Sequence, residues 1–175
     1  MRQGLIHIYT DEGKGKTTSA VGLGVRALSH GLNVCYSYYN KKPAQYGDTE
    51  IDSLEKLGAK IIGTANGHPS FRKMSVREEY KSQTQYSFRE MEKLIYNEHF
   101  DMLIMDEILI STRDGFLEEN KLIEFIKTKP RALELVMTGR GASEQLIELA
   151  DYVSYIENVK HPFEMGIASR KGIEY

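Results

Sequence analysis

The sequence predicts an α/β fold with a mostly parallel central sheet. Short apolar runs typical of strands alternate with stretches in which apolar residues recur at helical spacing. The run at residues 102–105, Met-Leu-Ile-Met, has no polar residue, as expected of a central parallel strand covered on both faces. A glycine- and lysine-rich loop at residues 13–18 joins the first apolar run to the first helical stretch. Such folds bind ligands beyond the carboxyl ends of their strands, so we expect a site at that edge.

Length and composition fit one domain. The chain has 175 residues, 41% hydrophobic and 27% charged, which predicts a single domain over residues 1–175 with a C-terminal tail at 160–175. A formal net charge of -2 gives no overall attraction to nucleic acid, so no nucleic acid partner is expected. Cys35 is the only cysteine, and no signal peptide or long apolar stretch is present, so we expect a cytoplasmic protein without membrane contact. The strand-like surroundings of Cys35 predict a buried, unreactive thiol.

The loop at residues 13–18 has the composition of a phosphate-binding loop. It follows a strand-like run at 5–9 and opens a helical stretch at 17–29. Glycines let backbone N–H groups turn toward phosphate oxygens, and the helix N-terminus adds positive partial charge. Lys16 is expected to reach between phosphates, and Thr17 to offer its hydroxyl to Mg²⁺. The predicted nucleotide-contacting residues are Gly13, Lys14, Gly15, Lys16, Thr17 and Thr18.

The start of this loop departs from the common template. Thr10 stands where G-x-x-x-x-G-K-[ST] has its first glycine, and Asp11 and Glu12 place two carboxylates beside the expected polyphosphate. Like charges there weaken anion binding unless they point outward or face a metal. A surface turn that merely caps a helix is the simpler alternative, but the strand before and the helix after favour a nucleotide site.

The middle of the chain is expected to add strands, helices and two long loops. The elements predicted are a strand at 34–39, a loop at 40–49, a short helix at 51–57, a strand at 60–63, a loop at 64–74 and a long helix at 75–97. The apolar stripe of the long helix is expected to belong mostly to the core; it comprises Tyr80, Tyr86, Phe88, Met91, Leu94 and Ile95.

Asp106 and Glu107 follow the apolar run at 102–105 directly. An acidic pair at the carboxyl end of a central strand can hold Mg²⁺, directly or through water, opposite the threonine of a phosphate-binding loop. A surface pair that merely ends the strand is the alternative. The loop at 13–18 favours the metal role, because both motifs suit one nucleotide site.

The last third of the chain predicts further strand and helix pairs. The elements expected are a helix at 117–126, a strand at 133–137, a helix capped by Ser143, a strand at 152–159 and then the tail. Arg140 lies in a turn at the carboxyl end of the strand at 133–137, where it can meet phosphate or a carboxylate. The sequence of this stretch alone is equally compatible with an exposed arginine that binds no ligand.

Six segments carry a resemblance to a known family. They are residues 13–18 (GKGKTT), 106–107 (DE), 135–141 (LVMTGRG), 146–151 (LIELAD), 159–163 (VKHPF) with Gly166, and 172–175 (GIEY). In this order, over nearly the whole chain, the sequence resembles the ATP:corrinoid adenosyltransferases of the CobA/BtuR type. The resemblance implies a P-loop NTPase, RecA-like three-layer fold and a homodimer. It also implies transfer of the 5′-deoxyadenosyl group of MgATP to Co(I) of a corrinoid, cobalamin or a precursor, with release of triphosphate.

For the nucleotide half, Lys16 and Glu107 are expected to act in catalysis. Thr17, Asp106 and Glu107 are the expected ligands of Mg²⁺. Two other functions remain open: a P-loop ATPase or kinase with a different acceptor, and a nucleotide-dependent binding module without turnover.

For the corrinoid half, the family places aromatic residues of the loop at 64–74 against the lower face of the corrinoid. Phe71 is assigned to that role, and His68 is kept as an alternative that would bind cobalt through its imidazole. Lys14, Arg140 and Lys160 are expected to contact phosphate or corrinoid side chains. An electron-donor flavoprotein is a further partner that the resemblance suggests.

Overall fold

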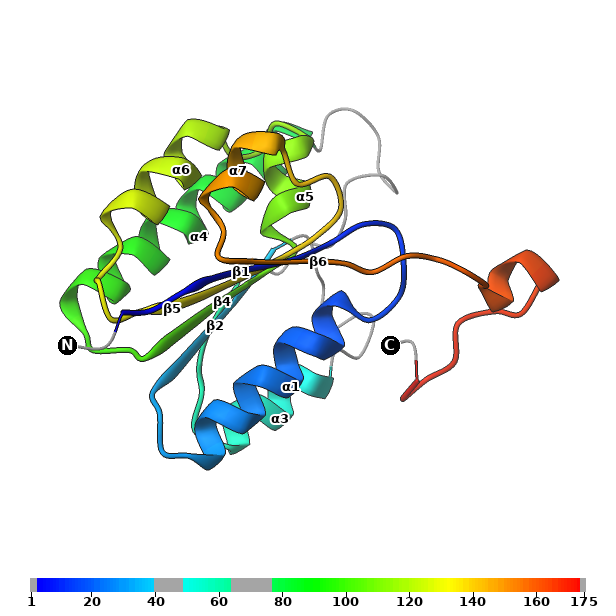
Figure 1. Cartoon of the computed structure of the whole chain (residues 1–175), viewed down its shortest axis with the longest axis horizontal. Helices are drawn as coiled ribbons and strands as arrows, with labels where there is room; N and C mark the ends of the chain where they lie inside the picture. Colours follow the sequence, from blue (N-terminus) through cyan, green and yellow to red (C-terminus); the bar gives the residue numbers. More distant parts are fainter. Residues whose placement is uncertain (1–2, 40–48, 64–76, 174–175) are drawn as a thin grey trace.

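The structure is a computed structural model that describes residues 3–39, 49–63 and 77–173, in which helices cover both faces of one sheet (Figure 1). The strands are β1 (Ile6–Thr10), β2 (Val34–Tyr38), β3 (Lys60–Gly63), β4 (Met102–Asp106), β5 (Glu134–Thr138) and β6 (Tyr152–Tyr155). The helices are α1 (Lys16–Ser29), α3 (Thr49–Lys56), α4 (Arg77–Asn97), α5 (Ile108–Arg113), α6 (Glu119–Thr128) and α7 (Glu144–Leu149), and a short 3-10 helix spans Pro162–Met165.

The sheet has the strand order β3-β2-β4-β5-β1-β6, and every pairing between neighbouring strands is parallel. The predicted α/β class with a P-loop NTPase-like architecture is confirmed. Because all six strands run the same way, their carboxyl ends meet at one edge. The loop after β1 and the ends of β4 and β5 are therefore brought together there, although they lie far apart in the sequence.

Each face of the sheet buries its own apolar cluster. Helices α1 and α3 lie on one face, and α4 to α7 on the other (Figure 1). Along β4 the side chains alternate: Ile104 packs into the cluster under α1, whereas Leu103 and Met105 pack into the cluster under α4 and α6. This double coverage confirms the prediction of a central buried strand.

Most of the predicted elements are confirmed, with three main differences. In the stripe of α4, Tyr80, Phe88, Met91 and Ile95 are buried as expected and Leu94 is partly buried, whereas Tyr86 is 59% exposed. Helix α5 was not predicted, because its six residues are too few to show helical periodicity.

The third difference concerns β6, which ends at Tyr155 rather than at Val159, and Val159 is 84% exposed. An apolar residue at the end of a run does not extend a strand unless a neighbouring strand pairs with it. The predicted burial of Cys35 is confirmed, and burial raises the pKa of its thiol to about 12. In the described part of the chain, no helix has the length and apolar character needed to cross a membrane.

Candidate active site

The loop between β1 and α1 requires glycine at two positions. The Gly13 N–H donates to the carbonyl oxygen of Ile156 at 2.6 Å, and a Cβ atom added to Gly13 would lie 2.3 Å from that oxygen. Gly15 has φ of 122°, a conformation that side chains other than hydrogen strongly disfavour. The backbone therefore requires both glycines of the Gly-x-Gly segment: Gly13 because there is no room for a side chain, and Gly15 because of its positive φ.

The side chain of Lys16 folds back into this loop. It is 7% exposed, and its Nζ donates to the carbonyl oxygens of Asp11 at 2.7 Å and Gly13 at 2.6 Å. Burial lowers the pKa of the ammonium and the charge of Arg140 lowers it further, against the carboxylates of Glu107, Glu12 and Asp11, which raise it. The loop therefore holds a buried lysine whose ammonium is bound to its own backbone and whose charged form burial disfavours.

Hydroxyl groups from three elements converge on the buried carboxylate of Asp106 at the end of β4. Thr138 of β5 donates to Oδ1 at 2.6 Å, and Tyr36 of β2 donates to Oδ2 at 2.8 Å. Thr17, in the first turn of α1, donates to Oδ1 at 3.0 Å and lies 3.3 Å from Oδ2. Because its proton is directed at Asp106, the lone pairs of the Thr17 oxygen remain available to a cation.

These residues fit the Mg²⁺ ion that the sequence predicts. Hydroxyl and carboxylate oxygens are the hard donors that this ion prefers. Within the described ranges, no group of three or more His, Cys, Asp or Glu side chains is placed to hold a metal. Mg²⁺ typically takes one or two protein oxygens and completes its shell with substrate phosphates and water, and Thr17 and Asp106 offer such oxygens.

Glu107 links the end of β4 to the turn after β5. It adopts a left-handed conformation with φ of 65°, and its N–H donates to Thr138 Oγ1 at 2.9 Å. The same turn contains Gly139, whose added Cβ would lie 2.9 Å from the Cβ of Leu109 in α5. The backbone after β4 is thus held in an uncommon conformation at the edge where a nucleotide is expected.

The two carboxylates at the start of the loop make local contacts. Asp11 Oδ1 accepts the N–H of Glu12 at 2.7 Å, and Glu12 Oε2 lies 3.1 Å from Arg140 Nη1. Both side chains of this ion pair are about half exposed, at 62% and 49%. Arg140, predicted to meet phosphate or a carboxylate, therefore lies beside the loop and contacts a carboxylate of that loop.

The other predicted site residues differ in their placement. Lys14 and Thr18 are exposed on the loop and on α1. Lys160 is exposed on the tail, which Figure 1 shows running away from the three layers. His68 and Phe71 lie outside the described residues, so their assignments stay predictions.

Sequence reasoning did not assign Tyr36 or Thr138 to the site. Thr138 ends a strand at the edge where a ligand is expected, and this position was the available signal. Tyr36 lies within an apolar run, where nothing in the local sequence separates a core tyrosine from one that contacts Asp106. Only the pairing of β2 with β4 reveals that contact.

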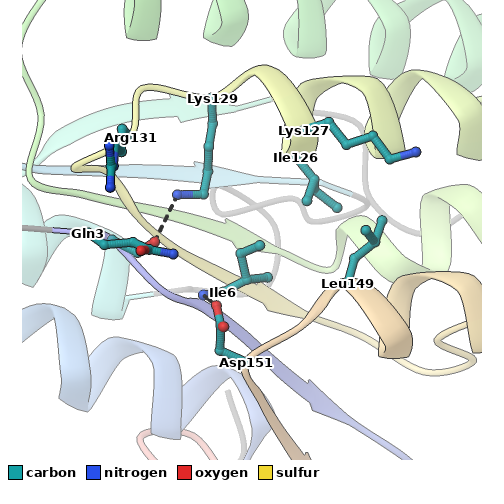
Figure 2. A pocket seen from close by; sticks show the side chains of 9 residues that line it. Gln3, Ile6, Ile126, Lys127, Lys129, Arg131, Leu149 and Asp151 are labelled. Carbon is teal, nitrogen blue, oxygen red and sulfur yellow. Dashed lines mark hydrogen bonds between the residues drawn. The ribbon is translucent and has the colours of Figure 1, made fainter.

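A cavity of about 540 Å³ opens at the opposite, amino edge of the sheet (Figure 2). It is lined by Gly4, Ile6, Lys127, Arg131 and Leu149 among others. Figure 2 shows the Lys129 side chain pointing to a backbone oxygen at this edge, and the Asp151 carboxylate beside the backbone of Ile6. These polar groups serve the fold, because they satisfy the backbone at the start of β1.

The comparisons with known proteins agree with the motifs. A family model described as ATP:corrinoid adenosyltransferase BtuR/CobO/CobP matches residues 2–175. A corrinoid adenosyltransferase of Sinorhizobium sp. is 31% identical over 175 residues, which cover 99% of this chain and 81% of that relative. The corrinoid adenosyltransferases of Escherichia coli K12 and Salmonella typhimurium LT2 are 28% and 29% identical over 173 residues, which cover 99% of this chain and 86% of each relative.

Proposed function

Because this chain belongs to the ATP:corrinoid adenosyltransferase family, we propose that it binds ATP at the carboxyl edge of its sheet through the loop at 13–18. Its function is to transfer the adenosyl group of ATP to a corrinoid. The observation that carries the assignment of the site is the hydrogen bond of 3.0 Å between Thr17 and Asp106, which joins the two nucleotide motifs.

The reaction requires positioning more than proton transfer. The Co(I) centre of the corrinoid substrate supplies an electron pair to C5′ of ATP. A cobalt–carbon bond forms as the C5′–O bond breaks, and triphosphate leaves with the electrons of the broken bond. The protein's contribution is then to align C5′ with cobalt and to stabilise the charge that develops on the triphosphate.

We assign Lys16 to the stabilisation of the negative charge that develops on the triphosphate. In the free protein its ammonium donates to two backbone carbonyls of its own loop. Phosphate oxygens are stronger acceptors than carbonyls because they carry negative charge. We therefore expect the ammonium to exchange these carbonyls for phosphate oxygens when ATP binds.

Thr17 and Asp106 are the residues that we assign to Mg²⁺, with Glu107 beside them. The ion would supply charge neutralisation on the phosphates when bound. Thr17 would offer its oxygen to the ion while its hydroxyl proton stays directed at Asp106. Arg140 and Lys14 would contact phosphate oxygens from either side of the loop.

The corrinoid half of the proposal concerns residues farther from the loop. Lys160 is assigned to a corrinoid side chain, and Phe71 to the lower face of the corrinoid, with His68 as the alternative through coordination of cobalt. Phe71→Ala should reduce adenosylation from Co(II) with a reductant far more than adenosylation from chemically reduced Co(I). A Co(II) spectrum with nitrogen coordination that disappears in His68→Ala would instead favour the histidine.

We further propose a homodimer that works in the cytoplasm and receives electrons from a flavoprotein. The tail supports the dimer, because Val159, Phe163 and Met165 are each more than 70% exposed on it. Sedimentation of the wild-type protein and of a Phe163→Ser, Met165→Ser variant tests this proposal. A wild-type chain that sediments as a monomer at micromolar concentration would contradict it.

Product analysis tests the reaction itself. With MgATP and a reduced corrinoid, we expect an adenosylated corrinoid and triphosphate in equal amounts. ADP in place of triphosphate would identify an ATPase or kinase, and binding without any product would identify a nucleotide-dependent binding module.

A further inference from the structure

We propose that Tyr36 is a positioning residue for the magnesium site, because its phenol fixes the Asp106 carboxylate that receives the Thr17 hydroxyl. The inference rests on the proposed metal role of Thr17 and Asp106, and it adds a residue that neither nucleotide motif contains. Its basis is the hydrogen bond of 2.8 Å from Tyr36 Oη to Asp106 Oδ2.

The pairing of β2 with β4 explains why this position reaches Asp106. Tyr36 is paired with Ile104, two residues before Asp106 on β4. Residues two apart on a strand share a face, so Tyr36, Ile104 and Asp106 all point toward α1. The phenol must therefore span the diagonal between strands, a distance that an aromatic side chain can cover and that short side chains cannot.

The distribution of donors over the two carboxylate oxygens gives Tyr36 its role. Oδ1 receives Thr138 at 2.6 Å and Thr17 at 3.0 Å, whereas Oδ2 receives Tyr36 at 2.8 Å and has Thr17 at 3.3 Å. Thr17 has a single hydroxyl proton, which it can direct well to only one oxygen. Because Tyr36 satisfies Oδ2, the proton of Thr17 is directed to Oδ1.

Removal of the phenol would disturb that division of donors. Oδ2 would lose a hydrogen bond in a site where Asp106 is fully buried, and the carboxylate would turn to recover a donor. The Thr17 proton would then shift toward Oδ2, and the lone pairs that face the ion would turn with it. Tyr36 thus acts on the ion through two other side chains, without touching the ion itself.

Tyr36→Phe isolates this effect, since the ring keeps its place in the apolar cluster that includes Ile104 and Val136. The matched control is Tyr39→Phe. Tyr39 is also fully buried and also close to the end of β2, but it packs in the cluster on the opposite face of the sheet. Its N–H donates to the carbonyl oxygen of Asp106 at 2.9 Å, and this backbone contact survives the substitution.

The experiment measures ATP binding by calorimetry with and without Mg²⁺, at a temperature far below the midpoint of thermal unfolding. That unfolding midpoint is also measured for each variant. A hydrogen bond to a charged group contributes substantial free energy, so its loss in Tyr36→Phe should raise about tenfold the Mg²⁺ concentration that gives half of the maximal enhancement of ATP affinity. ATP affinity without Mg²⁺ should stay unchanged. Tyr39→Phe should leave both quantities unchanged, whatever its effect on the unfolding midpoint.

Thr17→Ala separates this inference from the function on which it rests. If Thr17→Ala abolishes the Mg²⁺ enhancement and Tyr36→Phe leaves it unaltered, the positioning role of Tyr36 is wrong and the metal site stands. If Thr17→Ala leaves the enhancement unaltered, the proposed metal site itself is wrong. A Tyr36→Phe variant that only lowers the unfolding midpoint would assign this tyrosine to packing alone.

Discussion

Lys16, which is buried, and Lys129, which is half-buried, lie at opposite edges of the sheet and make nearly the same contacts. Lys16 Nζ donates to two carbonyl oxygens at 2.7 and 2.6 Å at the carboxyl edge, and Lys129 Nζ donates to those of Gly4 and Leu133 at 3.1 and 2.6 Å at the amino edge. Burial lowers the pKa of both ammonium groups. The local chemistry of an ammonium therefore does not reveal which lysine serves a ligand.

The surroundings of the two lysines separate them. Lys16 starts α1, so the positive end of that helix and the charge of Arg140 oppose the carboxylates of Glu107, Glu12 and Asp11 that also act on this lysine. Lys129 follows the last turn of α6, where the helix end is negative, and the carboxylates of Glu134 and Asp151 act on it. The start of α1 and Arg140 thus favour an anion at the first edge, whereas at the second edge the end of α6 adds negative charge and no arginine of the described residues is among the charges that act on Lys129.

The largest effect on MgATP binding and adenosyl transfer is expected for Lys16→Ala. Removal of the ammonium should weaken MgATP binding and adenosyl transfer by about a hundredfold or more, because charge-assisted contacts to phosphate are lost. The fold should be retained, since the lost contacts lie within one loop. Turnover assays and thermal unfolding check both statements, and unchanged turnover would remove the phosphate role from this loop.

Lys129→Met should show the opposite pattern. The carbonyl oxygens of Gly4 and Leu133 would lose a charged donor, which costs about 1–3 kcal/mol of unfolding free energy. ATP affinity should remain at the wild-type value. Denaturant unfolding and calorimetry provide the test, and a variant of wild-type stability that binds ATP poorly would reverse the roles of the two edges.

The proton linkage of ATP binding sharpens the contrast. The pKa of Lys16 is lowered from its ordinary 10.5, so just below that pH the free protein carries Lys16 partly neutral. A bound triphosphate favours the ammonium and raises its pKa, so binding must take up protons in this range. Calorimetry in buffers of different ionisation enthalpy should detect this uptake in wild type and in Lys129→Met. Lys16→Arg should take up fewer protons than wild type, because arginine at this position stays charged throughout.

The sequence predicted the carboxyl edge better than it predicted the contacts within it. Residues 13–18 and the acidic pair after β4 could be recognised because each motif is local, and both lie at the expected edge. The hydroxyl of Tyr36 could not, because its contact with Asp106 depends on which strand lies beside β4. The length of β6 was overestimated for the same reason, since strand ends are set by neighbours rather than by composition.

The two edges also differ in how they use an exposed carboxylate. At the amino edge, Asp151 Oδ2 accepts the N–H of Ile6 at 2.8 Å and so supports β1. At the carboxyl edge, Glu12 pairs with Arg140 at 3.1 Å, beside the loop that we propose to bind the triphosphate. The first carboxylate stabilises the fold, whereas the second would compete with the proposed triphosphate for Arg140.

Glu12→Gln should therefore tighten MgATP binding, with the smallest effect of the series. The ion pair is about half exposed, and such pairs contribute at most about 1 kcal/mol, so the gain should be about two- to fivefold in affinity. Asp151→Asn is the control, because it removes a carboxylate at the other edge and should leave ATP affinity unchanged. Higher salt should shrink the difference between Glu12→Gln and wild type, since screening weakens exposed charges. If Glu12→Gln instead weakens MgATP binding while ATP binding without metal is unaltered, the Glu12 carboxylate belongs to the metal site, and its contact with Arg140 is replaced when the nucleotide binds.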